Sequence, residues 1–436
     1  MKVFIQTLGC EKNTVDSENA AKILTDAGCT IAQDPQDADC FIVNTCGFIH
    51  DAKQQSIEAI FDLSRIKTEG KKLIVTGCLS QRYAKELSAE MPEVDAFLGV
   101  NDYLKLPEIV LGNRTERTLC SLAGKPYEEL GGRVLSTVPW SRSIKIAEGC
   151  SNICSYCAIP FIRGKYRSRQ PEAIINEAQK LAEEGCKEIV IIAQDVTFYG
   201  RDLGLKEALP KLLKDLCRIE GIEWIRLMYC YEDEITEGLI QTIKDEPKIC
   251  HYLDIPIQHC SGRILKAMNR KSTPESIWST ITNLRKQIPD IAIRTTLITG
   301  FPGETKEDFK ELYDFVKEAG FDRLGAFAYS KEEGTKAAEM PGQVRKDVKE
   351  RRRDRIMELQ REISLRHNQA LVGRTFKVLV EAQDDENTYT GRTFMDAPEI
   401  DNSVIFTSKK ALQPGSFAQV RITDAFDYDI SGEAVF

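Results

Sequence analysis

The sequence predicts an α/β protein of three successive parts, and two observations support this. Through the first two thirds of the chain, short β-prone runs alternate with longer helical stretches, which predicts parallel sheets covered by helices. From residue 373 onward the helical stretches stop, and short β-prone runs follow one another between turn residues such as Pro414-Gly415. That second pattern is typical of a small antiparallel barrel or sandwich. A length of 436 residues also favours two to four domains over a single core.

The first part, residues 1–117, predicts an N-terminal parallel-sheet α/β domain. Expected strands at 3–8, 40–44 and 72–76 alternate with expected helices at 16–27, 52–67 and 81–89. Gly28 stands where a glycine commonly ends a helix. Residues 101–142 are less regular and contain Gly131-Gly132, so they are interpreted as a connection to the next part.

The second part, residues 136–367, predicts six βα units. Its strand candidates are 143–147, 188–193, 224–229, 252–257, 292–298 and 323–328, with amphipathic helices such as 172–184 and 306–319 between them. Six such units suit a barrel or partial barrel, whose active site lies at the C-terminal ends of the strands. A dense run of both charge signs at 345–366 predicts a solvent-exposed linking helix. The third part, residues 370–436, has β-prone runs at 376–381, 388–393, 403–407 and 417–424.

The composition is that of a globular protein, with 42% hydrophobic and 29% charged residues and a net charge of −8. The N-terminal segment does not read as a signal peptide, and no apolar run approaches the ~20 residues needed to span a bilayer. We therefore expect a cytoplasmic protein that does not enter membranes. Fourteen cysteines in that reducing compartment are not a disulfide framework. Metal binding or catalysis is the better explanation for some of them.

One cysteine cluster lies directly after the first strand of the second part, in the run Cys150-Ser-Asn-Ile-Cys154-Ser-Tyr-Cys157. Three thiolates on one loop can hold three corners of a cubane iron–sulfur cluster and leave the fourth iron open for another ligand. Two alternatives are zinc binding and inert packing. A structural zinc site normally has four ligands, and no fourth Cys or His follows nearby. The spacing therefore favours an iron–sulfur cluster.

A second set of cysteines is dispersed along the first part. Cys10, Cys46 and Cys78 each follow an expected strand, and each stands beside a glycine. The C-terminal ends of parallel strands share one edge of a sheet, so these thiols can converge. The spacing alone leaves a second cluster site and unrelated packing open. The other eight cysteines are interpreted as packing residues, with Cys230 and Cys260 near strand ends as the strongest exceptions.

Gln194, Asp195, Gly300 and Glu304 stand at expected strand ends of the second part, where the mouth of a barrel would lie. Arg294 and Thr296 lie at alternate positions on the fifth expected strand, from which both could point into the barrel. A buried Arg294 would need a carboxylate partner, whereas Glu304 fits a ligand contact and a helix N-terminus equally well. The basic stretch from Arg163 to Arg169 contains Tyr166 and suits an RNA-binding surface or a grip on anionic groups.

The cluster motif C-x-x-x-C-x-x-C, with Tyr156 before its last cysteine, resembles that of the radical S-adenosylmethionine (SAM) enzymes. The resemblance implies a (β/α)6 partial barrel of radical SAM type. It also implies that SAM chelates the open iron and is cleaved to a 5′-deoxyadenosyl radical that abstracts hydrogen. Tyr156 and the six residues at the barrel mouth are then candidates for SAM binding.

Both cysteine sets, in this order, resemble the methylthiotransferase family along essentially the whole chain. The resemblance implies two 4Fe-4S clusters, with the auxiliary one on Cys10, Cys46 and Cys78 carrying the sulfur. One SAM supplies the methyl group and another supplies the radical. It also implies a C-terminal β domain of the TRAM type for substrate docking, and a reductant such as flavodoxin or ferredoxin.

Segments 193–200, 224–229 and 394–401 resemble the ribosomal-protein type of this family. That type implies methylthiolation of an aspartate β-carbon in protein twelve of the small ribosomal subunit, free or within the ribosome. Residues 371–436 hold eleven acidic and six basic residues, so we expect Asp396, Glu399 and Asp401 to help dock a basic protein. The alternatives are a tRNA adenosine methylthiotransferase and a non-catalytic iron–sulfur carrier.

Overall fold

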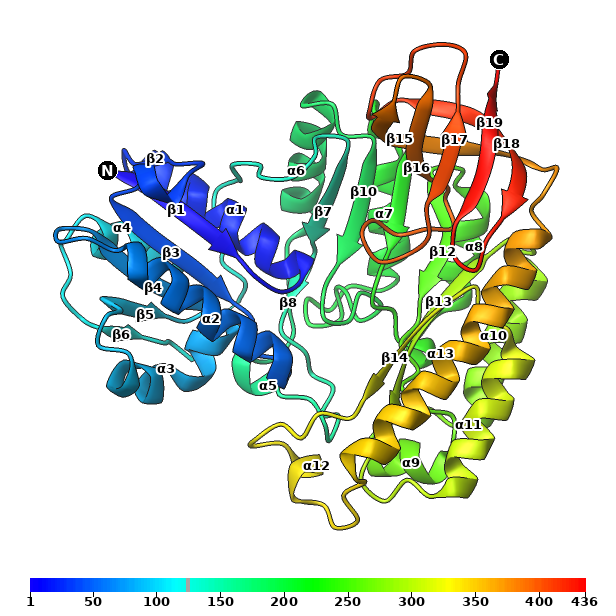
Figure 1. Ribbon diagram of the computed structural model, residues 1–436, viewed down its shortest axis with the longest axis horizontal. Coiled ribbons are helices and arrows are strands. Elements are labelled where there is room, and N and C mark those ends of the chain that lie inside the picture. The colour runs from blue at the N-terminus through cyan, green and yellow to red at the C-terminus, as the bar shows by residue number, and fades with distance from the viewer. Residues whose placement is uncertain (123–125) are drawn as a thin grey trace. The chain divides into compact units, whose positions relative to one another are not determined.

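The computed structural model describes residues 1–122 and 126–436. Its contacts divide it into two compact units, of which the first comprises residues 1–137, 145–173 and 330–338. The second comprises residues 138–144, 174–329 and 339–436. The first unit therefore holds the N-terminal sheet (blue in Figure 1) together with the Cys150–Cys157 loop of the second predicted part.

The first unit is built on a six-stranded parallel sheet of order β2-β1-β3-β4-β5-β6. Its strands are β1 (Lys2–Thr7), β2 (Thr30–Ile31), β3 (Cys40–Thr45), β4 (Lys72–Gly77), β5 (Ala96–Leu98) and β6 (Thr118–Leu119). Its main helices are α1 (Glu11–Asp26), α2 (His50–Ile66), α3 (Cys78–Glu90) and α4 (Leu106–Val110). The predicted strands are confirmed, and residues 103–119 add α4 and β6 to the domain where a connection was expected.

Helices cover both faces of this sheet, because β3 has apolar side chains on both of its faces. Ile42 packs with Leu24 of α1 and Leu106 of α4. Phe41, on the other face, packs with Ile60 of α2 and Leu87 of α3. Side chains alternate across a strand, so the apolar run 40–43 of β3 points to both faces of the sheet, and both faces must be covered.

Helix α1 begins at Glu11, five residues before the predicted start. Its first turns bury polar side chains, Lys12, Asn13 and Asp16, instead of apolar ones. Apolar periodicity is the primary signal for a helix, and it is missing there. These buried polar residues belong to the candidate site described below.

The second unit contains a six-stranded sheet of order β14-β13-β12-β11-β10-β7, in which the neighbours from β10 to β14 are parallel. Its strands are β7 (Ser141–Lys145), β10 (Glu188–Ile192), β11 (Trp224–Leu227), β12 (Ile249–Asp254), β13 (Ala292–Thr299) and β14 (Arg323–Ala328). Its principal helices are α6 (Pro171–Glu183), α7 (Ala208–Cys217), α8 (Glu237–Asp245), α10 (Pro274–Gln287) and α11 (Lys306–Ala319). β7 and β14 are the two ends of the sheet, as expected of a partial barrel (Figure 1).

Helix α13 (Lys346–Gln369) corresponds to the run of charges that predicted a solvent-exposed linker. It lies along α11 and β14 instead, and it buries Ile356, Leu359 and Ile363 (Figure 1). The linker interpretation was therefore wrong on one face of the helix. Three apolar residues at helical spacing outweigh the surrounding charges, because the charged side chains reach solvent from the other faces.

The C-terminal part is a closed five-stranded barrel of order β15-β16-β17-β19-β18. Its strands are β15 (Thr375–Asp385), β16 (Thr388–Arg392), β17 (Val404–Thr407), β18 (Phe417–Ala425) and β19 (Ile430–Val435). Strand β19, which was not predicted, contains Gly432 and pairs with β17 in parallel. A Cβ on Gly432 would lie 2.4 Å from the Arg421 carbonyl oxygen, so glycine permits the close approach that closes the barrel.

No helix in the described ranges, 1–122 and 126–436, is long and apolar enough to cross a membrane.

Candidate functional site

The three dispersed cysteines follow three adjacent strands, β1, β3 and β4. Cys10 caps the N-terminus of α1, Cys46 directly follows β3, and Cys78 is the first residue of α3. Cys10 is exposed, Cys46 is partly buried, and Cys78 is buried. Because the strands are parallel neighbours, all three thiols belong to one edge of the sheet.

Glycines allow the three cysteine loops to pack against one another. A Cβ on Gly9 would lie 2.8 Å from the Cys46 Cβ, and Gly9 has a φ of +96°. A Cβ on Gly47 would lie 2.7 Å from the carbonyl carbon of Cys78. Both distances are shorter than real contacts allow, so each loop touches the next only because a glycine stands there.

Asn13, which was not among the predicted site residues, links these loops. Its Nδ2 donates hydrogen bonds to the carbonyl oxygens of Leu8, at 2.7 Å, and Thr45, at 3.1 Å. Its Oδ1 accepts a hydrogen bond from Arg163 at 2.7 Å and lies 3.9 Å from the Cys78 sulfur. The available signal was a polar residue three positions after Cys10, one turn into a helix.

Burial opposes ionisation of two of these thiols. It raises the pKa of Cys46, and it raises the pKa of Cys78 to about 11 although the positive charge of Arg163 counteracts the effect. A buried thiolate needs compensating positive charge. The N-termini of α1 and α3 and the Arg163 guanidinium provide part of it, and a bound metal cluster would provide more.

The second cysteine set lies between β8 (Ala147–Glu148) and α5 (Ile159–Ile162). The loop closes where the amide of Cys150 donates to the Gly164 carbonyl oxygen at 3.0 Å. Burial, followed by the neighbouring thiols of Cys154 and Cys150, raises the pKa of Cys157 to about 12. The Cys157 thiol too needs compensating positive charge before it ionises.

Among the residues that the structure describes, no three His, Cys, Asp or Glu side chains are arranged to hold a single metal ion. His50, which follows Cys46 at a zinc-like spacing, is the exposed first residue of α2.

In the second unit, Gln194 and Asp195 follow β10 and Thr296 lies within β13, as the sequence predicted. Asp195 accepts hydrogen bonds from the Thr197 hydroxyl at 2.7 Å and from the Phe198 amide at 3.2 Å. Asp195 therefore shapes the turn after β10, and Gln194 is half-buried beside it.

Glu304 holds the turn after β13. One of its oxygens accepts from the amides of Gly300 and Phe301, at 2.6 and 3.1 Å, and the other accepts from Arg352 of α13 at 2.7 Å. Burial raises the pKa of Glu304, with Arg352 opposing the rise. A Cβ on Gly300 would lie 2.0 Å from the Cβ of Lys349, so this glycine is required by packing. The structure thus gives both residues structural roles at this strand end.

Arg294 corrects an expectation. Its guanidinium donates to Asp254 at 2.8 Å and to Asp401 of the C-terminal barrel at 3.3 Å. The carboxylates that a buried arginine needs are supplied by the chain itself. Arg294 therefore needs no carboxylate from a ligand such as SAM.

Two of the acidic residues expected to dock a partner are also internal. Asp396 pairs with Arg323 at 2.6 Å, and Asp401 accepts from Tyr252 at 2.7 Å. Both carboxylates are at most 3% exposed. Asp396 and Asp401 were therefore wrong as docking residues, while Glu399 is exposed.

These contacts show where the C-terminal barrel attaches in the second unit. Arg323 is the first residue of β14, Arg294 the third of β13, and Glu188 the first of β10. Arg392 of β16 reaches Glu188 at 2.6 Å. The C-terminal barrel therefore covers the N-terminal ends of the strands, opposite the ends where a radical SAM barrel has its active site.

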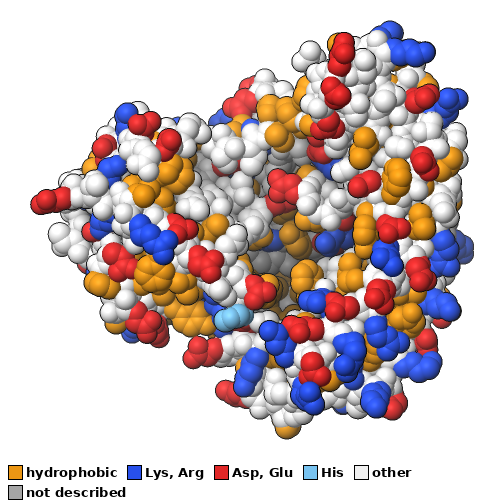
Figure 2. Space-filling model, in the orientation of Figure 1, with side chains coloured by type: hydrophobic (Ala, Val, Ile, Leu, Met, Phe, Trp, Pro, Cys, Tyr) orange, Lys and Arg blue, Asp and Glu red, His pale blue; other side chains and the backbone are white. Residues whose placement is uncertain are grey.

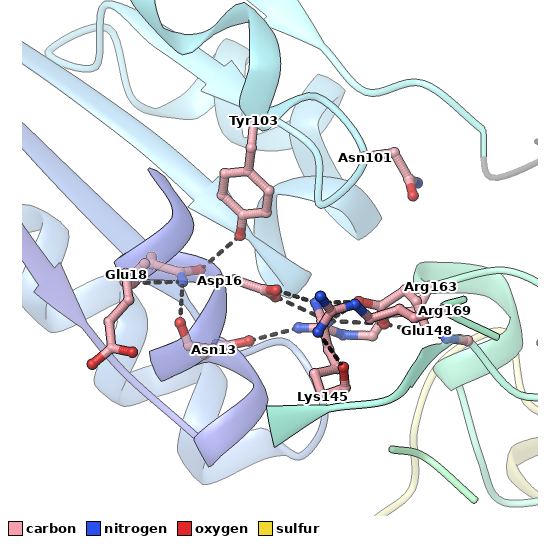
Figure 3. A network of polar contacts seen from close by, with 12 residues as sticks. Asn13, Asp16, Glu18, Asn101, Tyr103, Lys145, Glu148, Arg163 and Arg169 are labelled. Carbon is pink, nitrogen blue, oxygen red and sulfur yellow. Dashed lines mark hydrogen bonds and ion pairs between the residues drawn. The ribbon is translucent and has the colours of Figure 1, made fainter. Parts of the chain in front are cut away.

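The basic stretch from Arg163 to Arg169 is only partly a surface. Arg163 is 1% exposed, and Arg169 is buried and pairs with Glu129 at 2.7 Å. Figure 3 shows both side chains inside a network of polar contacts with helix α1 and the segment around Glu148. The expectation of an anion-gripping or RNA-binding surface was therefore wrong for these two arginines. Lys165 is exposed.

Three family descriptions match successive parts of the chain. Residues 2–99 match Uncharacterized protein family UPF0004, residues 144–316 match the Radical SAM superfamily, and residues 372–435 match the TRAM domain. Among solved structures, the radical SAM methyltransferase TsrM from Kitasatospora setae aligns with a TM-score of 0.59 and 14% identity, over 77% of this chain and 73% of that one. At that identity the likeness shows the fold.

Curated relatives match along the full length. The chain is 49% identical to "Ribosomal protein uS12 methylthiotransferase RimO" of Clostridioides difficile (strain 630), over 100% of this chain and 99% of the relative. It is 48% identical to proteins of the same name from Lachnoclostridium phytofermentans, over 100% of both chains, and Geobacter sulfurreducens, over 100% and 98%. With the radical SAM fold and this identity from end to end, the chain belongs to the RimO family of radical SAM methylthiotransferases.

Proposed function

We propose that this protein methylthiolates the β-carbon of an aspartate in ribosomal protein uS12 by a radical reaction. The observation that carries the proposal is the presence of two three-cysteine sites in one compact unit of a chain 49% identical to RimO relatives. An aspartyl β-carbon has no hydrogen that a side-chain base removes at neutral pH, so proton abstraction is not an available route. Hydrogen abstraction by a carbon radical avoids that barrier.

The donor sets fit two 4Fe-4S clusters, each with three thiolate ligands. Cys150, Cys154 and Cys157 would hold one, with SAM at its open iron. Cys10, Cys46 and Cys78 would hold the auxiliary one. When bound, these groups supply the electron, the carbon radical, the sulfur and the methyl group.

The chain's own side chains would orient these groups. Tyr156, Gln194 and Thr296 are the residues that we propose as contacts for SAM. Asp195 and Glu304 would act indirectly, because they hold the turns after β10 and β13. Gly300 would act indirectly too, because its lack of a side chain lets Lys349 pack against the turn after β13. Arg294 is not proposed as a contact for SAM, because its guanidinium already pairs with Asp254 and Asp401.

Three functional parts follow from this proposal: residues 1–117 for the auxiliary cluster, 136–367 for the radical chemistry and 370–436 for substrate docking. With Asp396 and Asp401 engaged internally, docking of a basic protein would rest on exposed acidic residues, such as Asp384 and Asp385 at the end of β15 and Glu386 in the turn that follows. The protein would act in the cytoplasm with a reductant such as flavodoxin or ferredoxin.

Metal analysis of the anaerobically reconstituted chain tests the cofactor count. Two cubanes predict about eight irons per chain. Triple replacement by Ala of either cysteine set should leave about four. Bound zinc, or loss of all iron from one triple variant, would contradict two independent clusters.

Mass spectrometry of uS12 and tRNA from a strain lacking the protein tests the substrate. The proposal expects uS12 to lose a methylthio group from one aspartate while adenosine modification stays intact. The purified enzyme should restore the group on uS12. Methylthiolation of tRNA adenosine in place of uS12 would overturn the substrate, and failure of the reduced protein to cleave SAM would indicate an iron–sulfur carrier.

A further inference from the structure

A buried arginine connects the two cysteine sites. The Arg163 side chain is 2% exposed and directly follows α5, six residues after Cys157. Its Nη1 donates to Asp16 and to Glu148, each at 3.0 Å, and its Nη2 donates to Asn13 at 2.7 Å (Figure 3). The same Asn13 Oδ1 lies 3.9 Å from the Cys78 sulfur, and the positive charge of Arg163 opposes the rise in the pKa of that thiol.

The two ends of the guanidinium thus have different neighbours. One nitrogen faces the carboxylates of Asp16 and Glu148, which are also paired with Lys145. Two cations and two carboxylates leave this buried group neutral overall. Ionised Cys78 would add a negative charge beside the other end, where the guanidinium can stabilise it with a charge-assisted hydrogen bond.

The contacts also join the loops that carry the cysteines. Glu148 and Arg163 bracket the Cys150–Cys157 loop, and their ion pair closes its base. Asp16 and Asn13 lie on α1, whose N-cap is Cys10, and Asn13 donates to the carbonyl oxygens of Leu8 and Thr45, which precede Cys10 and Cys46. Only a planar group with several fixed donors can serve both sides at once, which is a property of arginine and not of lysine.

We propose that Arg163 is a positioning residue that fixes the Cys150–Cys157 loop to the auxiliary site and supplies positive charge to the thiolate of Cys78. The inference rests on the proposed two-cluster function. Positive charge and hydrogen bonds at a ligand sulfur favour the reduced, more negative state of a cluster, so Arg163 raises the reduction potential of the auxiliary cluster.

The test is a potentiometric titration, followed by electron paramagnetic resonance, of full-length protein in which Cys150, Cys154 and Cys157 are Ala. Only the auxiliary cluster then contributes. Arg163→Gln should lower the reduction potential of the auxiliary cluster by at least about 59 mV, which is a tenfold change in the equilibrium constant of a one-electron couple. Arg163→Lys keeps the positive charge but loses the planar set of N–H donors, so it should shift the reduction potential less.

Arg169→Gln is the matched control. Arg169 is a buried arginine of the same segment, bonded to Glu129 and to the Lys145 carbonyl oxygen. Its replacement should loosen the segment without moving the potential. If Arg163→Gln fails to fold, the double variant Asp16→Asn/Arg163→Gln removes one charge of each sign and keeps the buried group neutral, and it should show the same lowered potential.

An unchanged potential in both Arg163→Gln variants would overturn the inference and leave the two-cluster function intact. An equal shift in Arg169→Gln would overturn it as well, because general loosening would then explain the effect. If the background without Cys150, Cys154 and Cys157 binds no iron, the proposed two-cluster function itself fails, and the inference fails with it.

Discussion

Replacing Glu188 with Gln should loosen the attachment of the C-terminal barrel to the strands of the second unit. Glu188 is fully buried and accepts hydrogen bonds from Arg226 at 2.8 Å and from Arg392 of β16 at 2.6 Å. Glutamine has the same shape but no charge. Two buried guanidinium groups would then lose their shared counter-charge, and breaking a buried pair on one side costs far more than the pair contributes.

The magnitude follows from the electrostatics. Burial alone would raise the pKa of Glu188, but Arg392 and Arg226 outweigh it and hold the pKa at about 2, against an ordinary value of 4.5. Each pKa unit corresponds to about 1.4 kcal/mol, so the charged form is stabilised by roughly 3 kcal/mol. Because the folded pKa is depressed, this stability is complete above about pH 4.5 and is lost as the pH falls through 2.

Hydrogen exchange measured by mass spectrometry shows where in the chain this stability is lost. Peptides covering β10 and β16 should exchange on the order of 100-fold faster in Glu188→Gln, since about 1.4 kcal/mol is a factor of ten in opening. The ratio to wild type should stay constant from pH 6 to 8, because Glu188 is ionised in both the folded and the unfolded state there.

Glu223→Gln is the control. Glu223 pairs with Lys377 of β15 at 2.7 Å between the same two parts of the chain, but both side chains are more than a third exposed. An exposed pair contributes at most about 1 kcal/mol, so this variant should exchange nearly as wild type does. If Glu188→Gln protected β16 as well as wild type does, the reasoning on buried charge would be refuted.

Further predictions concern the cysteine sites and the C-terminal barrel. Cys154→Ala should abolish 5′-deoxyadenosine formation, measured by chromatography, whereas Cys46→Ala should keep it and lose sulfur insertion. Equal loss of cleavage in both would contradict the division of roles. Gly77→Ala should remove about half of the bound iron in metal analysis, because a Cβ there would lie 2.4 Å from Asn44 Oδ1 at a φ of +95°. Full iron content would show that the loops can move apart. Asp401→Lys would place a cation beside Arg294. It should lower the free energy of opening of the C-terminal barrel, measured by hydrogen exchange, by about 3–5 kcal/mol. Glu399 is exposed, so Glu399→Lys should change this free energy little. Similar losses in the two variants would mean that burial of Asp401 does not cause the effect.

Local pattern predicted the sheets well because it reports a repeating environment. Each of the six strands of the partial barrel lies within a few residues of its predicted range, and Cys10, Cys46 and Cys78 follow the strands that were expected to carry them. A rule of parallel sheets, that C-terminal strand ends share one edge, was enough to predict that these three cysteines stand at one edge of the sheet. The missed strand β19 has a glycine in its centre, which weakens the pattern that identifies strands.

The sequence by itself determined the order of the parts, the strands of both parallel sheets and the cysteines at their ends, because apolar periodicity and cysteine spacing are local signals. Only the tertiary structure decided what the charges do. Arg163 meets Asp16 across 147 residues, and Arg323 meets Asp396 across 73. A charged side chain looks the same in the sequence whether it faces water, a ligand or a buried partner, and long-range packing selects among these because an unpaired buried charge is too costly to leave. Residues expected to grip RNA, SAM or a ribosomal protein are therefore found joining distant parts of the chain.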